Sequence, residues 1–394
     1  QITASHHPYH RNGLKFFTPQ GGLDAPDITE ILALAQEGAH PEREAPGSVD
    51  PCGYMKDYAA RLRRTIQEGV NAPDYSHPLA GLHIVVDAGN GAGGFYATGV
   101  LEPLGADISG SQFLEPDGMF PNHVPNPENE EAMASICQAV KAAHADLGVI
   151  FDTDVDRGAA VDHRGQEINR NRLVALASAI ALEGHPGGTV VTDSITSDGL
   201  KEYIETTLGG KHHRFKRGYK NVINEALRLN QEGVDCPLAI ETSGHAAMGE
   251  NHFLDDGAYL VTKILIKMAT LRREGKDLED LLAPLREPAE AAEVRLPITE
   301  EDFRARGEAL IAALEEYAKA QGWAIAPDNR EGLRVSFPEG EGEGWFLLRL
   351  SVHGPILPVN LESDAPGGVK LLGQKLLAFL ESSPEGIDIS PMVR

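Results

Sequence analysis

The chain has 394 residues, 41% of them hydrophobic and 24% charged, a composition typical of a globular protein of roughly two to four domains, and no apolar run is long enough to span a membrane. Its formal net charge of −24 argues against a nucleic-acid partner, because binding the phosphate backbone requires clustered Lys and Arg. Three cysteines that are well separated in sequence, and the lack of a visible signal-peptide pattern, lead us to expect a protein of the reducing cytoplasm without a membrane partner.

Two helices are predicted near the start of the chain. Asp27 and Glu30 form a capping-box pattern ahead of the sequence ILALAQEGA, which predicts the first helix. Asp50 followed by Pro51 predicts the start of the second helix, because proline is favoured in the first helical turn. The positions of the second helix that we expect to face the core are Met55, Tyr58, Leu62 and Ile66.

Four short apolar runs follow, and each leads into a polar or glycine-rich turn and then into a helical stretch. The runs with their turns read LHIVVDAGNGAGG, LGVIFDTDVDRG, GTVVTDSITSDG and PLAIETSGH. Near-continuous apolar strands that alternate with helices predict parallel or mixed sheets covered on both faces. Ligands of such sheets bind beyond the carboxyl ends of the strands, where this sequence places Asp87, Asp152, Asp193 and Glu241. We therefore expect the chemistry at these turns.

The pattern changes toward the carboxyl end. Candidate linkers lie at 71–81, 182–188 and 285–293. After the third linker, a charged helix from about residue 300 to residue 321 precedes the runs GLRVSF and GWFLLRLSV and a final helix through GVKLLGQKLLAFLE. This order predicts a small α+β unit with an antiparallel sheet, placed after the α/β units.

The sequence DTDVDRG carries the sharpest chemical signal. Asp152, Asp154 and Asp156 occupy alternate positions directly after an apolar strand, and three carboxylates in one turn repel one another unless a cation neutralises them. Oxygen ligands at this density suit Mg²⁺ or Mn²⁺. Arg157 beside the three acids indicates that a phosphate also binds at this turn.

Three interpretations of this turn were compared. An EF-hand loop requires Gly at the sixth position and Glu at the twelfth, where this sequence has Arg157 and His163, so that interpretation fails. A phosphatase of the haloacid-dehalogenase type would use Asp152 as the nucleophile, with Asp255 and Asp256 as its later acidic pair. In the third interpretation, the acids hold a metal ion that serves a nucleophile elsewhere in the chain.

The opening stretch TASHHPYHRNGLKFF supplies a candidate nucleophile. Ser5 lies in a polar turn beside two histidines, and an Asn-Gly-x-Lys segment follows. A hydroxyl that accepts a phosphoryl group needs nearby hydrogen-bond donors and a proton acceptor. Lys15 and His6 are the candidates for the acceptor.

Two further loops offer groups for a ligand. In ETSGH, Glu241 and Ser243 end a strand and present acceptors suited to sugar hydroxyls, and His245 follows. In RLSVHGP, Arg349 and Ser351 precede a glycine-containing loop and suit a phosphate dianion.

The sequence GNGAGG at residues 89–94 satisfies the G-x-G-x-x-G pattern of dinucleotide-binding proteins. That pattern also requires an acid at the end of the next strand. Asp107 comes too early for this position, so we do not expect a dinucleotide site.

Together these loops resemble those of the α-D-phosphohexomutases, the family of phosphoglucomutases and phosphomannomutases. TASHHPYHRNGLKFF is similar to the phosphoserine loop of the family, VVDAGNGAGG to the start of its second domain, and FDTDVDRGAAVD to its metal loop. ETSGH is similar to the sugar-specificity loop, FKRGYK to the substrate loop of the third domain, and RLSVHGPIL stands in the place of the phosphate-binding loop. PDGMFPNHVPNPEN is close to another stretch characteristic of the family, and the resemblance covers nearly the whole chain.

The resemblance implies an α/β protein with three related α/β domains that have mixed sheets, plus a smaller C-terminal α+β domain, around a central cleft. The implied parts are the remainder of an N-terminal phosphoserine domain at 1–72, a metal-loop domain at 73–184, a domain with the sugar-binding loop at 185–288 and a phosphate-binding domain at 289–394. The family carries most of its first domain before the serine loop, whereas only Gln1–Ala4 precede Ser5 here. We therefore expect this chain to lack most of that domain.

The activity implied by the resemblance is interconversion of hexose 1-phosphate and hexose 6-phosphate, of glucose, mannose or both, through phosphoserine and a bisphosphorylated intermediate. The implied catalytic residues are Ser5, Lys15, His6 and His245. The implied Mg²⁺ ligands are Ser5, Asp152, Asp154 and Asp156. The implied substrate-binding residues are Arg157, Arg217, Lys220, Glu241, Ser243, Arg349 and Ser351. Glucose 1,6-bisphosphate is implied as an activator, and a hexose phosphate as the partner.

The phosphate loop departs from the family pattern, because Val352, His353 and Gly354 replace the expected polar run. We expect phosphate binding to depend more on Arg349, Ser351 and backbone donors, and substrate preference to change with it. Two other hypotheses stay open. One is the phosphatase that uses the first aspartate of the acidic turn, and the other is an inactive, truncated fragment that binds sugar phosphates. The sequence predicts no oligomeric state.

Overall fold

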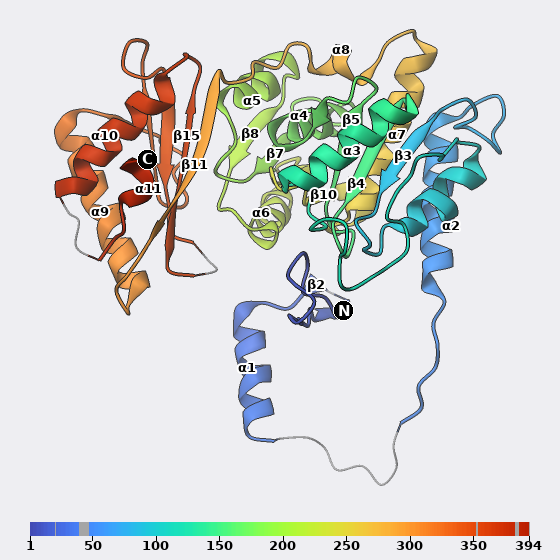
Figure 1. Cartoon of the computed structure of the whole chain (residues 1–394), viewed down its shortest axis with the longest axis horizontal. Coiled ribbons are helices and arrows are strands. Elements are labelled where there is room, and N and C mark those ends of the chain that lie inside the picture. Colours follow the sequence, from blue (N-terminus) through green and yellow to red (C-terminus); the bar gives the residue numbers. More distant parts are fainter. Residues whose placement is uncertain (20, 39–46, 352–353, 383–385, 394) are drawn as a thin grey trace. The chain divides into compact units, whose positions relative to one another are not determined.

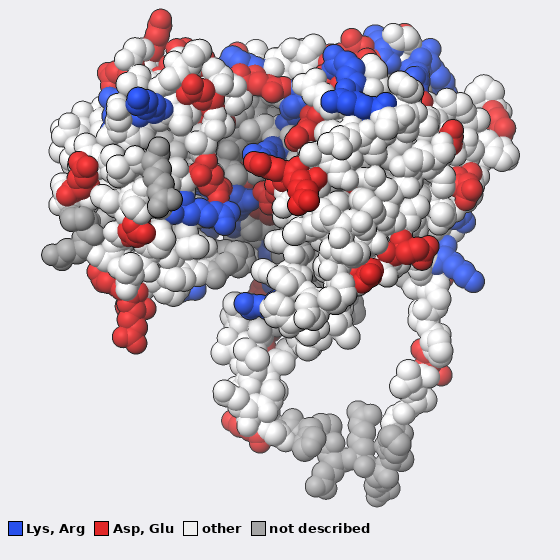
Figure 2. All heavy atoms as spheres, viewed as in Figure 1, with Lys and Arg blue, Asp and Glu red and all other residues white. Residues whose placement is uncertain are grey.

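The computed structural model describes residues 1–19, 21–38, 47–351, 354–382 and 386–393. The chain forms two compact units, Gln1–Glu167 and Ile168–Arg394, each with its own sheets and helices (Figure 1). None of the helices in the described ranges combines the length and the apolar character needed to cross a membrane. Basic as well as acidic side chains lie on the face drawn in Figure 2, so the acidic composition leaves room for local basic sites.

The first unit begins with small polar elements. Strands β1 (Phe17–Thr18) and β2 (Gly21–Gly22) pair antiparallel and lead into helix α1 (Ala25–Gln36). This helix starts three residues earlier than the capping box predicted, because Asp27 accepts a hydrogen bond from the backbone N–H of Asp24 at 2.8 Å. None of the described residues of α1 is buried.

Helix α2 (Tyr54–Val70) is amphipathic and packs on the first unit. It begins after Gly53 rather than at Pro51 as predicted, and Asn71 ends it in the left-handed conformation with φ 45°. Two of the predicted core positions are confirmed, whereas Met55 is 48% exposed because it lies in the first turn of the helix. The buried residues of α2 are Ala59, Leu62, Ile66 and Val70.

The sheet of the first unit is mixed, as predicted, and its order is β3-β4-β5-β6. Strands β3 and β4 pair parallel, and β4 and β5 pair antiparallel (Figure 1). The strands are β3 (Ile84–Asp87), β4 (Leu147–Phe151), β5 (Gly158–Asp162) and β6 (Glu167–Ile168). The helices are a π-helix (Tyr96–Leu101), a 3-10 turn (Glu102–Leu104) and α3 (Glu130–Ala143). Every residue of β3, β4 and β5 is buried, which explains the continuous apolar runs.

The glycines of GNGAGG are explained by close packing rather than by a nucleotide. A Cβ atom on Gly91 would lie 2.7 Å from the carbonyl oxygen of Thr153, and one on Gly94 would lie 2.0 Å from that of Leu114. Both glycines therefore let this loop approach neighbouring backbone, including the acidic turn itself. The helical stretch expected after the motif is present, and most of it is the π-helix Tyr96–Leu101.

The second unit contains an α/β part and an α+β part. Its first sheet has the order β10-β9-β7-β8, in which β7 pairs parallel with both β8 and β9, and β10 pairs antiparallel with β9. The strands are β7 (Thr189–Thr192), β8 (Lys211–Arg214), β9 (Leu238–Ile240) and β10 (Ala246–Met248). The helices are α4 (Arg170–Leu182), α5 (Asp198–Glu202), a π-helix (Tyr203–Thr207), α6 (Tyr219–Gln231), a 3-10 turn (Gly249–Asn251), α7 (Gly257–Arg273) and α8 (Leu278–Leu282).

The α+β part has an antiparallel sheet of order β11-β15-β14-β13-β12, as predicted. Its strands are β11 (Glu290–Pro297), β12 (Ala324–Ile325), β13 (Leu333–Phe337), β14 (Gly344–Leu348) and β15 (Ile356–Ser363). Its helices are α9 (Phe303–Gln321), α10 (Gly368–Ser382) and α11 (Ser390–Val393). The apolar faces of α9 and α10 share one core with this sheet.

The structure divides the chain between Glu167 and Ile168, and α4 packs against α7 and α8 of the second unit. The four domains predicted at 1–72, 73–184, 185–288 and 289–394 stay a prediction. Mixed sheets followed by an antiparallel α+β part agree with the predicted fold class.

Candidate active site

The four predicted acids all lie directly at strand ends. Asp87 ends β3, and the other three follow β4, β7 and β9; all four are buried. Asp87 is engaged within the fold, because it accepts a hydrogen bond from Gln112 Nε2 at 2.7 Å and lies 3.1 Å from Nε2 of the buried His123. The remaining acids lie at the turns where we expect the chemistry; they are Asp152, Asp193 and Glu241.

The acidic turn connects the antiparallel strands β4 and β5. Each of Asp152, Asp154 and Asp156 offers one carboxylate oxygen, and the three atoms lie within 4.8 Å of one another. The Oδ1 atom of Asp154 is buried and has no hydrogen-bond partner among the described residues. Three clustered carboxylates, one with an unsatisfied buried oxygen, fit a hard divalent cation such as Mg²⁺.

Arg157 links this turn to its surroundings. Its side chain is 3% exposed, and its Nε donates to Oδ2 of Asp152 at 3.0 Å. Its backbone N–H donates to Oδ1 of the same carboxylate at 3.1 Å. Another guanidinium nitrogen, Nη1, donates to Asn126 at 3.0 Å. The third guanidinium nitrogen, Nη2, also lies 3.0 Å from Oδ2 of Asp152. Arg157 therefore fixes Asp152, and it shares Nη2 between that carboxylate and other partners.

Ser5 lies against this arginine. Nη2 of Arg157 donates to Oγ of Ser5 at 3.1 Å and to Nδ1 of His6 at 2.8 Å. The serine Oγ is itself 3.2 Å from that histidine nitrogen. Ser5 adopts φ 52°, a left-handed conformation that costs free energy for a residue with a side chain. The structure thus brings the predicted nucleophile, a histidine and the acidic turn together.

Lys15 belongs to the same cluster. Its Nζ lies 2.8 Å from Oδ2 of Asp156 and 3.4 Å from Oδ2 of Asp154. In this pairing the Lys15 ammonium donates to both carboxylates. The proton-transfer role expected for Lys15 stays a prediction. Lys15 neutralises part of the charge that a metal ion would otherwise neutralise.

In the second unit, Asp193 and Glu241 follow the neighbouring parallel strands β7 and β9. The carboxylate of Glu241 accepts from the N–H of Gly218 at 2.6 Å, and that of Asp193 accepts from Oγ1 of Thr242 at 2.8 Å. Burial, and next the charge of Asp193, raise the pKa of Glu241 to about 7. Burial likewise raises the pKa of Asp193. Ser243, two residues after Glu241, has a buried Oγ without a hydrogen-bond partner among the described residues.

His245 is oriented by a carboxylate and a ring. Its Nδ1 lies 2.8 Å from Oδ2 of Asp255, and the ring of Tyr219 stacks on the imidazole at a centroid distance of 5.1 Å. Asp256 caps α7 by accepting from the N–H of Tyr259 at 2.9 Å. Asp255 and Asp256 therefore each have a partner within the second unit.

Arg217 and Lys220 lie at the start of α6. The backbone N–H of Arg217 donates to Glu331 at 2.8 Å, and its Nε is 4.0 Å from Oδ2 of Asp193. Lys220 is the second residue of α6. The segment therefore presents basic groups beside the buried acids at the ends of β7 and β9.

Arg349 follows the last residue of β14 and is 7% exposed. Its Nε is buried without a hydrogen-bond partner among the described residues. Burial, and next the charge of Arg217, lower the pKa of Arg349. Two nearby guanidinium groups, one with an unsatisfied nitrogen, suit a dianion. The N–H of Ser351 donates to the carbonyl of Ile356 at 2.9 Å, and the altered positions 352 and 353 lie outside the described residues.

Two residues of these sites were missed by sequence reasoning. Asn126, the acceptor for Arg157, lies in the stretch PDGMFPNHVPNPEN, which was noted without a role for this residue. Glu331, the acceptor for the N–H of Arg217, lies in a loop that shows no chemical pattern. The first was within reach of sequence reasoning, whereas the second depends on a tertiary contact.

A serine hydroxyl held against an acidic turn, in a chain of mixed α/β sheets, is the arrangement of a phosphoryl-transfer enzyme. Residues 57–165 match the family model described as phosphoglucomutase/phosphomannomutase, alpha/beta/alpha domain II, and residues 169–288 match that of domain III. The chain is 30% identical to a phosphoglucomutase of Neisseria gonorrhoeae over 390 residues, which cover 97% of this chain and 77% of the relative. It is 31% identical to a phosphomannomutase/phosphoglucomutase of Pseudomonas syringae pv. tomato, also over 390 residues, with 98% and 77% covered.

A solved structure agrees with these matches. The crystal structure of a phosphoglucomutase/phosphomannomutase family protein from Burkholderia thailandensis is similar with a TM-score of 0.80 and 26% identity, covering 98% of this chain and 76% of that chain. The chain therefore belongs to the phosphoglucomutase/phosphomannomutase family, the α-D-phosphohexomutases. It is a hexose phosphate mutase, an isomerase that transfers phosphate within a sugar. The hypotheses of a phosphatase and of an inactive fragment are not favoured.

Proposed function

We propose that Ser5 carries the phosphoryl group in this mutase, and that glucose and mannose phosphates are its substrates. The observation that carries the proposal is the placement of the Ser5 Oγ, 3.1 Å from Arg157, which in turn holds Asp152. A guanidinium at this position stabilises negative charge on a phosphoryl group attached to the serine.

The transfer balances as two exchanges. Phospho-Ser5 gives its phosphoryl group to a sugar hydroxyl, so that a new sugar O–P bond forms while the Ser5 Oγ–P bond breaks, and the hydroxyl proton moves to a base. The bisphosphate then reorients and returns its other phosphoryl group to Ser5. His6, whose Nδ1 is 3.2 Å from Oγ, is the candidate to hold the serine proton, in exchange for the hydrogen bond that Nδ1 accepts from Arg157. His245, oriented by Asp255, is the candidate base for the sugar hydroxyl.

Asp152, Asp154 and Asp156 are proposed to hold Mg²⁺, together with the phosphate on Ser5. Support comes from their clustered oxygens and the unsatisfied Oδ1 of Asp154. When bound, Mg²⁺ supplies neutralisation of charge on the phosphoryl group. Lys15 contributes a second positive charge to the same carboxylates.

The second unit is proposed to bind the rest of the substrate. Glu241 and Ser243 would bind sugar hydroxyls, and support comes from the buried, unpartnered Oγ of Ser243. The remaining basic and hydroxyl groups would bind the phosphate that does not react; these are Arg217, Lys220, Arg349 and Ser351. A bisphosphorylated sugar such as glucose 1,6-bisphosphate would activate the enzyme, because it can phosphorylate Ser5 directly.

The test is to incubate the protein with glucose 1,6-bisphosphate and Mg²⁺ and to map phosphorylation by mass spectrometry. We expect one phosphate on Ser5 that is stable to hydroxylamine, and no phosphate or mutase activity in Ser5→Ala. Ser48→Ala, a change at an exposed serine, is the matched control and keeps both. A hydroxylamine-labile phosphate on Asp152 would overturn the proposal. Comparing kcat/KM for glucose 1-phosphate and mannose 1-phosphate then defines the sugar preference.

A further inference from the structure

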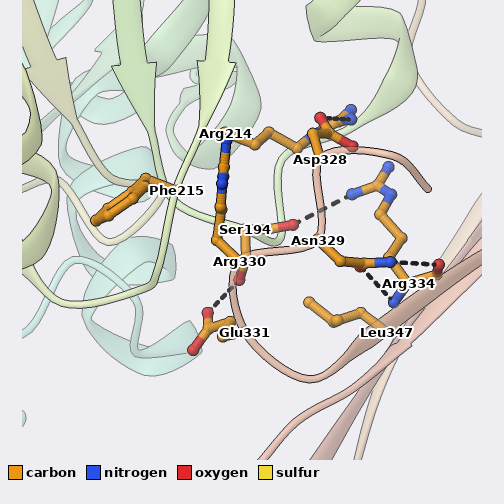
Figure 3. Close-up of a pocket in the computed structure, with 9 residues that line it drawn as sticks. All are labelled: Ser194, Arg214, Phe215, Asp328, Asn329, Arg330, Glu331, Arg334 and Leu347. Carbon is orange, nitrogen blue, oxygen red and sulfur yellow. Dashed lines mark hydrogen bonds and ion pairs between the residues drawn. The ribbon is translucent and has the colours of Figure 1, made fainter. Parts of the chain in front are cut away.

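Glu331 contacts the loop of Arg217, which the proposed function assigns to the substrate phosphate, and a second loop that follows β7. It lies in the loop before β13, and its Oε1 accepts from the backbone N–H of Arg217 at 2.8 Å. The same oxygen accepts from Oγ of Ser194, which follows β7 (Figure 3). One carboxylate of the α+β part therefore holds two loops of the α/β part.

Glu331 is also fixed relative to Arg349. Gly332 has φ 57°, and a Cβ atom at this position would lie 2.1 Å from the carbonyl oxygen of Leu348 and 2.8 Å from Cα of Arg349. Leu333 then pairs with Leu348 in the ladder of β13 and β14. The backbone next to Glu331 therefore packs closely against the backbone of Arg349.

The charges at this place require a carboxylate. Arg217 and Arg349 are close enough for the charge of the first to lower the pKa of the second, after the larger effect of burial. Like-charged groups repel when they are near one another in a partly buried site. The negative charge of Glu331 acts on Arg349 in the opposite direction and offsets part of this repulsion.

A neighbouring arginine, Arg334, also joins the α+β part to the α/β part, through contacts that do not involve Glu331. Arg334 is buried and donates to the carbonyl oxygens of Ser194 at 3.2 Å and Thr196 at 2.9 Å. It also donates to Asp198 at 2.8 Å. Figure 3 draws the guanidinium of Arg334 beside the carbonyl oxygen of Ser194. These contacts hold the two parts together, so a change at Glu331 can alter the alignment of the loops without separating the parts.

We propose that Glu331 is a positioning residue that aligns the Arg217 loop with Arg349, so that both arginines engage the same substrate phosphate. This inference rests on the phosphate-binding roles proposed above for the two arginines. Without the carboxylate, the N–H of Arg217 and the hydroxyl of Ser194 lose their acceptor. The negative charge that offsets the repulsion between the guanidinium groups of Arg217 and Arg349 is lost as well. Substrate binding then weakens, whereas the chemical step at Ser5 is unchanged.

The experiment compares steady-state kinetics of Glu331→Ala, Glu331→Gln and the matched control Glu308→Ala, whose glutamate is exposed on α9. We expect Glu331→Ala to raise KM for hexose 1-phosphate about tenfold, as loss of a hydrogen bond to a charged group does, with kcat within about threefold. Glu331→Gln gives a smaller rise in KM, since its amide oxygen still accepts. Glu308→Ala behaves as the unchanged enzyme in KM, kcat and urea midpoint. The urea midpoint of Glu331→Ala falls modestly, because two donors lose their acceptor, and its kcat stays within the stated range.

Arg349→Ala separates this inference from the function on which it rests. An unchanged KM in Arg349→Ala would refute the phosphate role of Arg349 and leave Glu331 nothing to align. A raised KM in Arg349→Ala with an unchanged KM in Glu331→Ala would overturn the inference alone. Two further results also overturn the inference. The first is a large loss of kcat together with a large fall of the urea midpoint in Glu331→Ala. The second is a rise in KM of the double variant, Glu331→Ala with Arg349→Ala, that equals the product of the two single rises, because residues that act together do not have independent effects.

Discussion

The Arg157–Asp152 pair predicts a large loss of stability when the arginine is removed. Arg157→Ala leaves Asp152, which is fully buried, without the Nε and Nη2 donors that lie 3.0 Å from its Oδ2. Of the contacts that residue 157 makes with this carboxylate, the variant keeps only the hydrogen bond from the backbone N–H. Removing one partner of a buried ion pair costs about 3–5 kcal/mol of the free energy of unfolding.

The same unit contains a matched control. Arg164 binds Asp162 with similar geometry, with Nε at 2.9 Å and Nη2 at 2.8 Å from Oδ2. Its side chain is 53% exposed, compared with 3% for Arg157, and the carboxylate of Asp162 keeps the N–H groups of residue 164 and Gln166. Arg164→Ala should therefore cost about 0–1 kcal/mol.

Urea unfolding followed by far-UV circular dichroism measures both losses, and hydrogen exchange of the β4 amides assigns them to the first unit. Both tryptophans, Trp323 and Trp345, lie in the second unit, so their fluorescence should report the same transition in both variants. Equal losses in the two variants would refute the reasoning from burial. A change in the tryptophan-reported transition would refute the assignment to the first unit.

Three other predictions concern separate parts of the chain. Burial raises the pKa of Glu362 from 4.5 to about 7, so the folded form binds the proton more tightly and stability falls as the pH rises from about 4.5 to 7. Glu362→Gln should remove this pH dependence and stabilise the protein above pH 7 by up to about 3 kcal/mol. Urea unfolding at pH 5 and pH 8 measures the effect, and an unchanged pH dependence of the free energy of unfolding contradicts the prediction. Lys15→Met should bind Mg²⁺ about tenfold more tightly in calorimetric titration, because the ammonium competes for the same carboxylates; equal or weaker binding argues against this competition. Gly94→Ala should lose about 1–3 kcal/mol in urea unfolding, whereas Gly118→Ala, where a Cβ meets no atom within 4 Å, should lose much less.

The strand ends could be predicted from the sequence because burial on both faces is a local property. The runs before Asp152, Asp193 and Glu241 are continuously apolar, and each is a buried strand in the structure. The antiparallel α+β part was also predictable, since its runs and helices follow one another without the strand–helix alternation of the earlier part. The apolar runs therefore predict which residues lie at the carboxyl end of each strand.

The partners of the polar side chains could not be predicted in the same way. Lys15 pairs with Asp154 and Asp156, and nothing in the sequence around Lys15 indicates these partners, because they lie in a loop far along the chain. Glu331 stands in a loop without periodicity, and its role depends on contacts with Ser194 and Arg217. Periodicity reports the burial of a segment, whereas such contacts depend on which loops the tertiary fold brings together.

The acidic turn has both of its ends in one ladder. Phe151 pairs with Gly158, and β4 and β5 are buried along their whole length. A residue inserted within either strand would have to form a bulge or move the side chains beyond it to the other face of the sheet. The ladder therefore fixes both ends of the turn, and residues 152–157 between them include all three acids. A chain that keeps this hairpin keeps the three carboxylates at fixed sequence distances from the same two strand ends.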